Sequence, residues 1–130
     1  MILLVQAVMT AATVCFALGY VQRFRDNARH RAWMAAGIVL TIGIAVVLVA
    51  GVHLFGATYG PAPWLIDLMG GEAPARQVLS AHRALATLTF LALVAQGFAG
   101  WRRHPLHRRL WRLVIPLWIA SYGSGMIIFQ

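Results

Sequence analysis

The fold is decided by residues 101–125, WRRHPLHRRLWRLVIPLWIASYGSG, in which an arginine cluster leads directly into an apolar run. That run continues to residue 129 without a charged side chain, and three similar uncharged stretches cover residues 2–21, 32–52 and 84–100. A helix needs roughly 17–25 apolar residues to cross the core of a bilayer. The sequence therefore predicts an all-α integral membrane protein with four transmembrane helices.

The composition agrees with this class. The chain is 61% hydrophobic, and it carries three acidic residues against eleven basic ones, all of them arginine. A soluble domain normally contains about a quarter of charged residues. The arginines gather in two short loops beside apolar runs, which favours a role in membrane topology over nucleic-acid binding.

The arginines also predict the orientation. Residues 23–31 hold four of them and residues 102–112 hold five, whereas residues 54–77 hold only Arg76 together with two acids. Loops rich in basic residues stay on the cytoplasmic side. We therefore expect residues 1–130 to form a single domain, an up-down four-helix bundle in a bacterial inner membrane, with both termini on the outer, periplasmic side.

The helix boundaries follow from local signals. We predict helices at about 2–22, 27–54, 75–101 and 106–129, with an outer loop at 55–74 whose WLIDLM core lies along the membrane surface. Asp26 is a suitable N-cap for the second helix. Pro105 is acceptable where the fourth helix begins, since proline fits the first turn.

The five histidines lie near the predicted helix ends. His30 opens the second helix and His107 the fourth, so the two are expected at one depth on diagonal neighbours of the bundle. His53 closes the second helix and His82 lies early in the third, on the outer side. Imidazole is a favoured ligand for haem iron, copper and zinc, so two bis-histidine sites are predicted, His30/His107 and His53/His82. His104 has no counterpart and is left out.

Two other readings of the histidines stay open. His30 and His53 are 23 residues apart, which is roughly 34 Å along a helix and leaves both sites at the membrane interfaces. Electron transfer directly between such sites would be slow, and the two ends could hold unrelated sites. Histidines at helix ends could also simply interact with lipid phosphates.

Several neighbouring residues bear on the identity of the bound group. Met34, four residues after His30, would add a thioether that suits Cu(I), although core packing also explains it. Arg83 and Arg112 could neutralise haem propionates, and Arg83 could instead pair with an outer-side acid. Cys15 is the only cysteine and no CxxCH motif occurs, so a haem would be held without covalent attachment.

The last helix resembles a known motif. The residues that carry the resemblance are His107, Arg112, Pro116, Trp118, Ser121, Ser124 and Gly125. Their spacing is similar to that of the last helix in a family of small bacterial four-helix membrane proteins, domain of unknown function 420, which includes CtaM-type proteins that support maturation of haem-copper terminal oxidases. His30 with Met34, His53 and His82 match the family's second and third helices. The resemblance implies a role in the respiratory chain.

We expect a binding, assembly or electron-transfer protein rather than an enzyme, because the sequence offers no hydrolytic constellation and no phosphate-binding loop. The expected role is that of a maturation factor or accessory subunit of a terminal oxidase or related complex, binding haem b or copper. The alternatives are a b-type di-haem cytochrome that takes electrons from quinol, and a purely structural membrane subunit.

Overall fold

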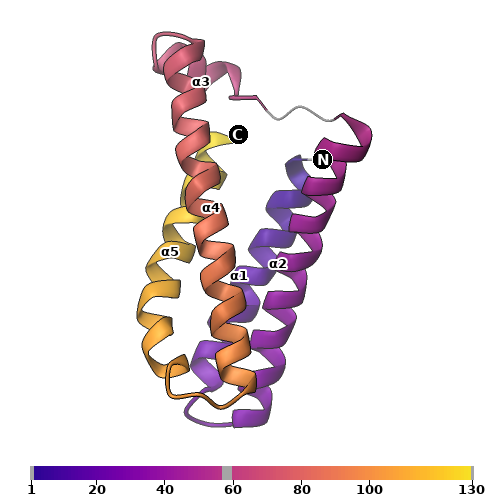
Figure 1. Cartoon of the computed structure of the whole chain (residues 1–130), viewed down its shortest axis with the longest axis vertical. Helices are drawn as coiled ribbons and strands as arrows, with labels where there is room; N and C mark the ends of the chain where they lie inside the picture. Colours follow the sequence, from indigo (N-terminus) through magenta and orange to yellow (C-terminus); the bar gives the residue numbers. More distant parts are fainter. Residues whose placement is uncertain (1, 57–59, 130) are drawn as a thin grey trace. The chain divides into compact units, whose positions relative to one another are not determined.

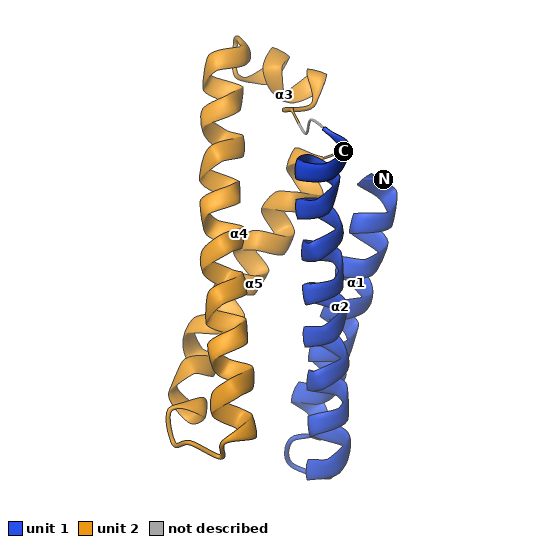
Figure 2. Cartoon of the chain, turned by 45° about the vertical axis from the view of Figure 1, so that its right-hand side comes forward, with its two compact units in different colours: residues 1–57 blue, residues 58–130 orange. Residues whose placement is uncertain are grey.

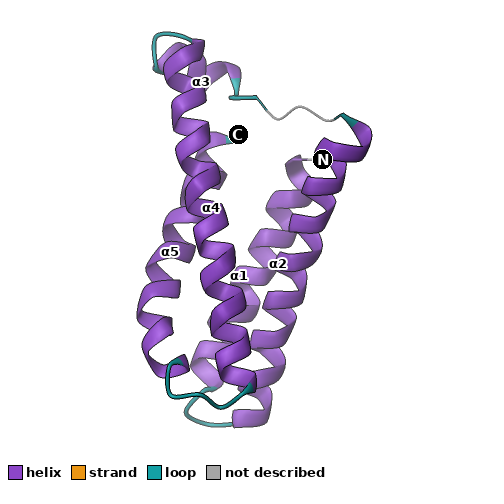
Figure 3. Cartoon of the chain, in the orientation of Figure 1, coloured by secondary structure: helices purple, strands orange, loops and turns teal. Residues whose placement is uncertain are grey.

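The computed structural model describes residues 2–56 and 60–129, and over this part of the chain it contains helices and connecting loops but no strand (Figure 3). The five helices are α1 (Ile2–Gln22), α2 (Asn27–Phe55), α3 (Pro63–Leu68), α4 (Glu72–Trp101) and α5 (His107–Ile128) (Figure 1). All but α3 are long and apolar enough to cross a membrane. The prediction of an all-helical chain with four candidate transmembrane helices is confirmed.

The outward faces of these helices suit contact with lipid. Large apolar side chains are exposed along them, among them Leu3, Val39, Leu91 and Ile119, with Leu3 80% exposed. Even the shortest of the four helices, at 21 residues, extends roughly 31 Å, about the thickness of the hydrocarbon core. The chain is therefore a multi-pass membrane protein by the length and composition of its helices.

The chain divides into two compact units, residues 1–57 and residues 58–130 (Figure 2). In the first unit α1 and α2 form an antiparallel hairpin with a seam of small residues. Gly37 is needed in this seam, because a Cβ atom there would lie only 2.5 Å from the Phe16 ring. Ala12, Cys15 and Gly19 are buried on α1 at the alternating spacing of three and four that keeps side chains on one helix face.

The start of α2 is fixed by Asp26. Its Oδ1 atom accepts hydrogen bonds from the backbone N–H groups of Ala28, at 2.9 Å, and Arg29, at 3.1 Å. The predicted N-cap is confirmed. At its other end α2 stops at Gly56, which adopts the left-handed conformation with φ of 63° that favours glycine at helix ends.

The second unit contains α3, α4 and α5. The short helix α3 lies within the predicted outer loop, and Gly70 and Gly71, both with positive φ, separate it from α4. A small core of Leu65, Ala75, Leu79 and Ile128 packs α3, α4 and the end of α5 together. This core holds α3 against α4 and α5, and the prediction of a loop at 55–74 did not include it.

Helix α4 begins at Glu72, three residues before the predicted start. Glu72 stands in the first turn, where a negative charge is favourable, and Arg76 Nε donates to its carboxylate at 3.1 Å. Pro74 is tolerated because the first-turn N–H groups need no helical partner. In the same unit, α5 stays helical through Pro116, near its middle.

We expect Asp26→Ala to lower the free energy of unfolding by about 1 kcal/mol, since it removes both N-cap hydrogen bonds. Unfolding in mixed micelles, titrated with a denaturing detergent and followed by circular dichroism, measures this. Asp26→Asn keeps a cap acceptor and should stay close to the unsubstituted protein. Equal losses in the two variants would contradict a capping role.

Candidate functional site

His30 is held by the helix that precedes it. It lies in the first turns of α2, and its Nδ1 atom is 2.7 Å from the carbonyl oxygen of Gly19 in α1. A backbone carbonyl can only accept a hydrogen bond, so Nδ1 must carry the proton and donate. Nε2, the other nitrogen of the neutral ring, then keeps a free lone pair.

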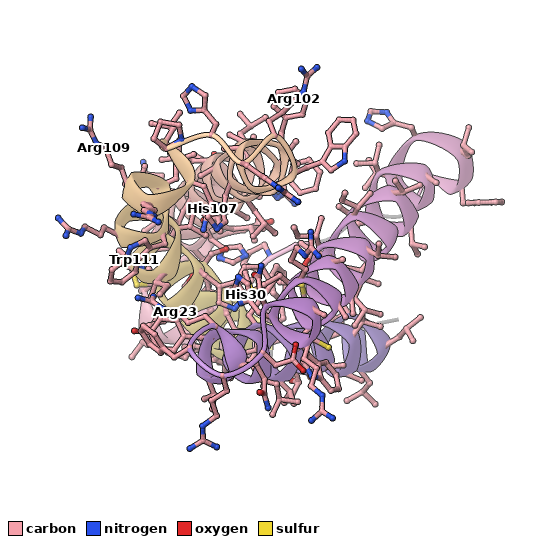
Figure 4. All side chains as sticks on the ribbon, turned by 90° about the horizontal axis from the view of Figure 1, so that it is seen from below. Arg23, His30, Arg102, His107, Arg109 and Trp111 are labelled. Carbon is pink, nitrogen blue, oxygen red and sulfur yellow. The ribbon has the colours of Figure 1, made fainter. Side chains whose placement is uncertain are left out.

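His107 repeats this arrangement in the second unit. It is the first residue of α5, and its Nδ1 atom lies 3.1 Å from the carbonyl oxygen of Gln96 in α4. In each hairpin the acceptor is the carbonyl 11 residues before the histidine. Figure 4 shows Arg102 and Arg109 extending outward from the loop after α4 and from α5. The two rings have the same tautomer for the same reason.

A glycine makes room for the His107 ring. A Cβ atom at Gly100 would lie 2.9 Å from Nδ1 of His107, which is closer than such atoms approach in folded proteins. The ring therefore packs directly on the backbone near the end of α4. Gly100 is a positioning residue for the imidazole.

His82 is fixed by a side chain instead of a carbonyl. Its Nδ1 atom lies 2.8 Å from the hydroxyl oxygen of Ser124 in α5. That hydroxyl donates its own proton to the carbonyl of Ala120 at 2.7 Å, so its oxygen accepts from His82. The ring also meets Phe129 edge-on, with centroids 5.5 Å apart, and its Cε1 atom would be 3.2 Å from a Cβ at Gly125. Ser124 and Gly125 thus mark a close contact between α5 and α4.

The two remaining histidines differ from these three. His104 is exposed, and its Nδ1 atom accepts a hydrogen bond from the N–H of Leu106 at 3.2 Å. The proton of the neutral His104 ring is therefore on Nε2, the opposite tautomer. His53 is exposed near the end of α2. Only His30, His82 and His107 combine a held Nδ1–H with a free Nε2.

The histidines of each unit lie at two levels. Along α2, His53 is 23 residues from His30, or roughly 34 Å. Along α4, His82 is 14 residues from Gln96, whose carbonyl holds His107, and this corresponds to roughly 21 Å. Each predicted pair takes one histidine from each unit, and both pairings stay predictions.

The other predicted site residues have clear local roles. Met34 packs on α1, because its Sδ atom would be 2.8 Å from a Cβ at Gly19. The guanidinium of Arg112 lies over the Trp111 ring, 5.9 Å from its centroid. Arg83 is exposed on α4 beside His82. Their contacts with a bound group stay predictions.

The structure adds Gln96, which the sequence did not single out. Its backbone carbonyl holds His107, and its side-chain Oε1 atom is buried without a hydrogen-bond partner. No sequence feature of Gln96 itself predicts this role, because its contact with His107 depends on the register of α4 and α5. The only related feature in the sequence is the nearby Gly100, whose lack of a side chain makes room for the His107 ring.

Metal-ligating side chains form no cluster in the part of the chain that the structure describes. Within residues 2–56 and 60–129, no three His, Cys, Asp or Glu side chains gather closely enough to hold a metal ion. Cys15 is buried in the first unit. His30, His82 and His107 each present a single imidazole that is oriented through Nδ1.

Comparison of the chain with protein-family models, with curated proteins and with solved structures found no match. The resemblance described above therefore depends on the histidines and the last-helix residues alone.

Substituting Gly100 tests how the His107 ring is held. We expect Gly100→Ala to push the ring away from Gln96 and to lower the free energy of unfolding by about 1 kcal/mol, the usual contribution of one hydrogen bond. Gly123→Ala is the matched control in α5, where a Cβ atom meets nothing within 4 Å. It should be neutral or stabilising, because alanine is the better helix former. A detergent unfolding titration compares the two, and a Gly100→Ala variant as stable as Gly123→Ala would contradict the contact.

Proposed function

We propose that this chain is a multi-pass protein of a bacterial inner membrane that binds haem b or copper through the Nε2 atoms of His30 and His107. The observation that supports this proposal is the shared Nδ1 contact, at 2.7 Å to Gly19 O and 3.1 Å to Gln96 O. Metal-binding histidines almost always donate the other ring N–H to a carbonyl or carboxylate, which fixes the ring and raises the basicity of the ligand nitrogen.

The proposed topology brings the two rings to one depth. Both hairpins turn in an arginine-rich segment, and such segments stay in the cytoplasm. In an up-down bundle with both termini outside, α2 and α5 are diagonal neighbours across the core. His30 and His107 open these two helices, so the pair belongs to the cytoplasmic mouth of the bundle.

His53 and His82 form a weaker pair. His82 is the better ligand candidate of the two, because Ser124 orients its ring. The main proposal therefore depends on His30 and His107.

A haem at this site would supply one-electron redox chemistry. His30 and His107 would hold it through their Nε2 atoms, and Arg112, exposed near the start of α5, would neutralise a propionate. Arg83 would do the same for a haem at His82. The site needs no covalent attachment.

Copper is the second candidate, and the position of Met34 favours it. The Met34 thioether packs at Gly19, the residue whose carbonyl holds His30. An imidazole and a thioether on one turn of a helix suit Cu(I). Electron transfer and metal delivery would therefore use the same ligand, His30.

The resemblance to domain of unknown function 420 supports the role of a maturation factor or accessory subunit of a haem-copper oxidase. A b-type cytochrome that receives electrons from quinol is the alternative with the same ligands. A structural subunit is the alternative without a metal, because the same Nδ1 contacts would then serve only to join neighbouring helices.

Asparagine substitutions show whether a histidine is a metal ligand or only joins two helices. An asparagine side chain can place an N–H near the position of Nδ1 but offers nothing at Nε2. We expect His30→Asn and His107→Asn each to lose most of the bound haem or copper while the stability stays within about 1 kcal/mol. His104→Asn should keep the full content. A visible spectrum and a metal assay on the same purified samples measure this.

These outcomes also distinguish the alternatives. Sharp reduced α-bands identify a haem protein, and copper without haem supports metal delivery. Full retention of the metal in both His30→Asn and His107→Asn would refute the proposed site. A structural subunit would give a different pattern. Freshly prepared membranes would then contain neither haem nor copper, and the asparagine variants of His30 and His107 would be stable whereas the alanine variants would not.

Met34→Leu tests the copper alternative. Leucine keeps the volume that packs on Gly19 but removes the sulfur. If the centre is Cu(I), we expect the affinity to fall at least tenfold, as a competition assay with a colorimetric copper chelator would show. Unchanged affinity would remove Met34 from the ligand set.

A further inference from the structure

The loop between α4 and α5 forms a strongly basic surface. We call the unit 2 basic surface the five arginines on this loop and the first turns of α5, all of them exposed: Arg102, Arg103, Arg108, Arg109 and Arg112. The two acidic residues of this unit lie at the other end of the 30-residue helix α4, Glu72 as its first residue and Asp67 before it. A helix of that length spans roughly 45 Å, so no carboxylate of the unit neutralises this surface.

Aromatic rings hold part of this surface in place. The Arg102 guanidinium lies over both Phe98, at 5.3 Å from the ring centroid, and Trp101, at 5.7 Å. Arg112 lies over Trp111 in the same way. A guanidinium stacked on a ring keeps its N–H edge free. The stacked arginines therefore present donors outward, as Figure 4 shows for Arg102.

Apolar side chains lie on the same surface. Trp101 is 77% exposed, Phe98 is 56% exposed and Leu106 is 44% exposed. A soluble phosphate compound would contact the arginines but not the exposed apolar side chains beside them. A phospholipid would contact both, because its headgroup phosphate lies directly above its acyl chains.

The first unit repeats this combination. Arg23, just after the end of α1, lies over Tyr20 at 4.9 Å and over Phe24 at 4.3 Å. Its neighbour Asp26 is already engaged by the N-cap hydrogen bonds and by Arg29, whose Nε is 3.3 Å from Oδ2. Both hairpins thus end in an arginine that is stacked on aromatic rings at the end of an apolar helix.

We propose that the unit 2 basic surface binds the headgroup phosphates of anionic phospholipids. Arg102 and Arg103 bind the phosphate, and stacking on Phe98 and Trp101 orients Arg102 for a two-point contact with phosphate oxygens. Trp101 and Phe98 extend to the upper acyl chain. Each basic residue near a membrane surface contributes about 1 kcal/mol of attraction to anionic lipid, which is roughly fivefold in affinity. This surface does not depend on the proposed metal site.

Native mass spectrometry of the full chain tests the lipid site. The protein is equilibrated in mixed micelles that contain equal amounts of phosphatidylglycerol and phosphatidylcholine with the same acyl chains. The ratio of the two lipids retained on the protein is then measured. We expect the unsubstituted chain to favour phosphatidylglycerol and the variant Arg102→Gln with Arg103→Gln to lose that preference by roughly 25-fold, or fivefold per arginine.

Matched variants show whether the lipid preference comes from a local site or from the net charge of the protein. Arg76→Gln removes one charge at the other end of α4 and should leave the ratio unchanged, whereas Arg109→Gln, on the helical part of the surface, should lower it about fivefold. Arg102→Lys keeps the charge but not the planar two-point contact, so it should retain only part of the preference. Circular dichroism confirms that each variant is folded.

Three results would overturn the proposal. The first is equal retention of the two lipids by the unsubstituted chain. The second is an equal loss of preference in Arg76→Gln and Arg109→Gln, which would indicate net charge without a site. The third is complete displacement of phosphatidylglycerol by millimolar inorganic phosphate, which would identify an anion site that does not select lipid.

Discussion

The rings of His30 and His107 are half-buried, and a ring N–H that is shielded from water must find an acceptor, because leaving it unpaired costs more than the net value of a hydrogen bond. In both hairpins the preceding helix supplies this acceptor as a backbone carbonyl. The requirement fixes the tautomer, the direction of the ring and the register of the two helices together. The ligand chemistry proposed for His30 and His107 follows from this one bond.

Glycine makes the close contacts possible. Gly19 receives Met34, Gly100 receives the ring of His107 and Gly125 receives the ring of His82, each at a distance that a Cβ atom would obstruct. In a bilayer such close packing is the main source of helix association, since lipid is as apolar as the side chains. The same small residues therefore serve packing and the placement of the imidazoles.

The sequence predicted the spans well and the contacts poorly. Charge distribution and apolar runs were enough for the four long helices, and Asp26 identified the start of α2 because its signal is local. The start of α4 and the short helix α3 were missed, since they depend on a core formed by Leu65, Leu79 and Ile128. The role of Gln96 was beyond reach as well, because its contact with His107 depends on how α4 and α5 meet.

The separation of 11 residues between each histidine and its carbonyl has a consequence for biogenesis. A loop that short closes rapidly and with little loss of chain entropy. Each hairpin can therefore form its histidine contact soon after its own two helices leave the ribosome, without waiting for the rest of the chain. The imidazoles would be oriented before the hairpins assemble, and capture of the proposed cofactor would then be a late step in the maturation of the protein.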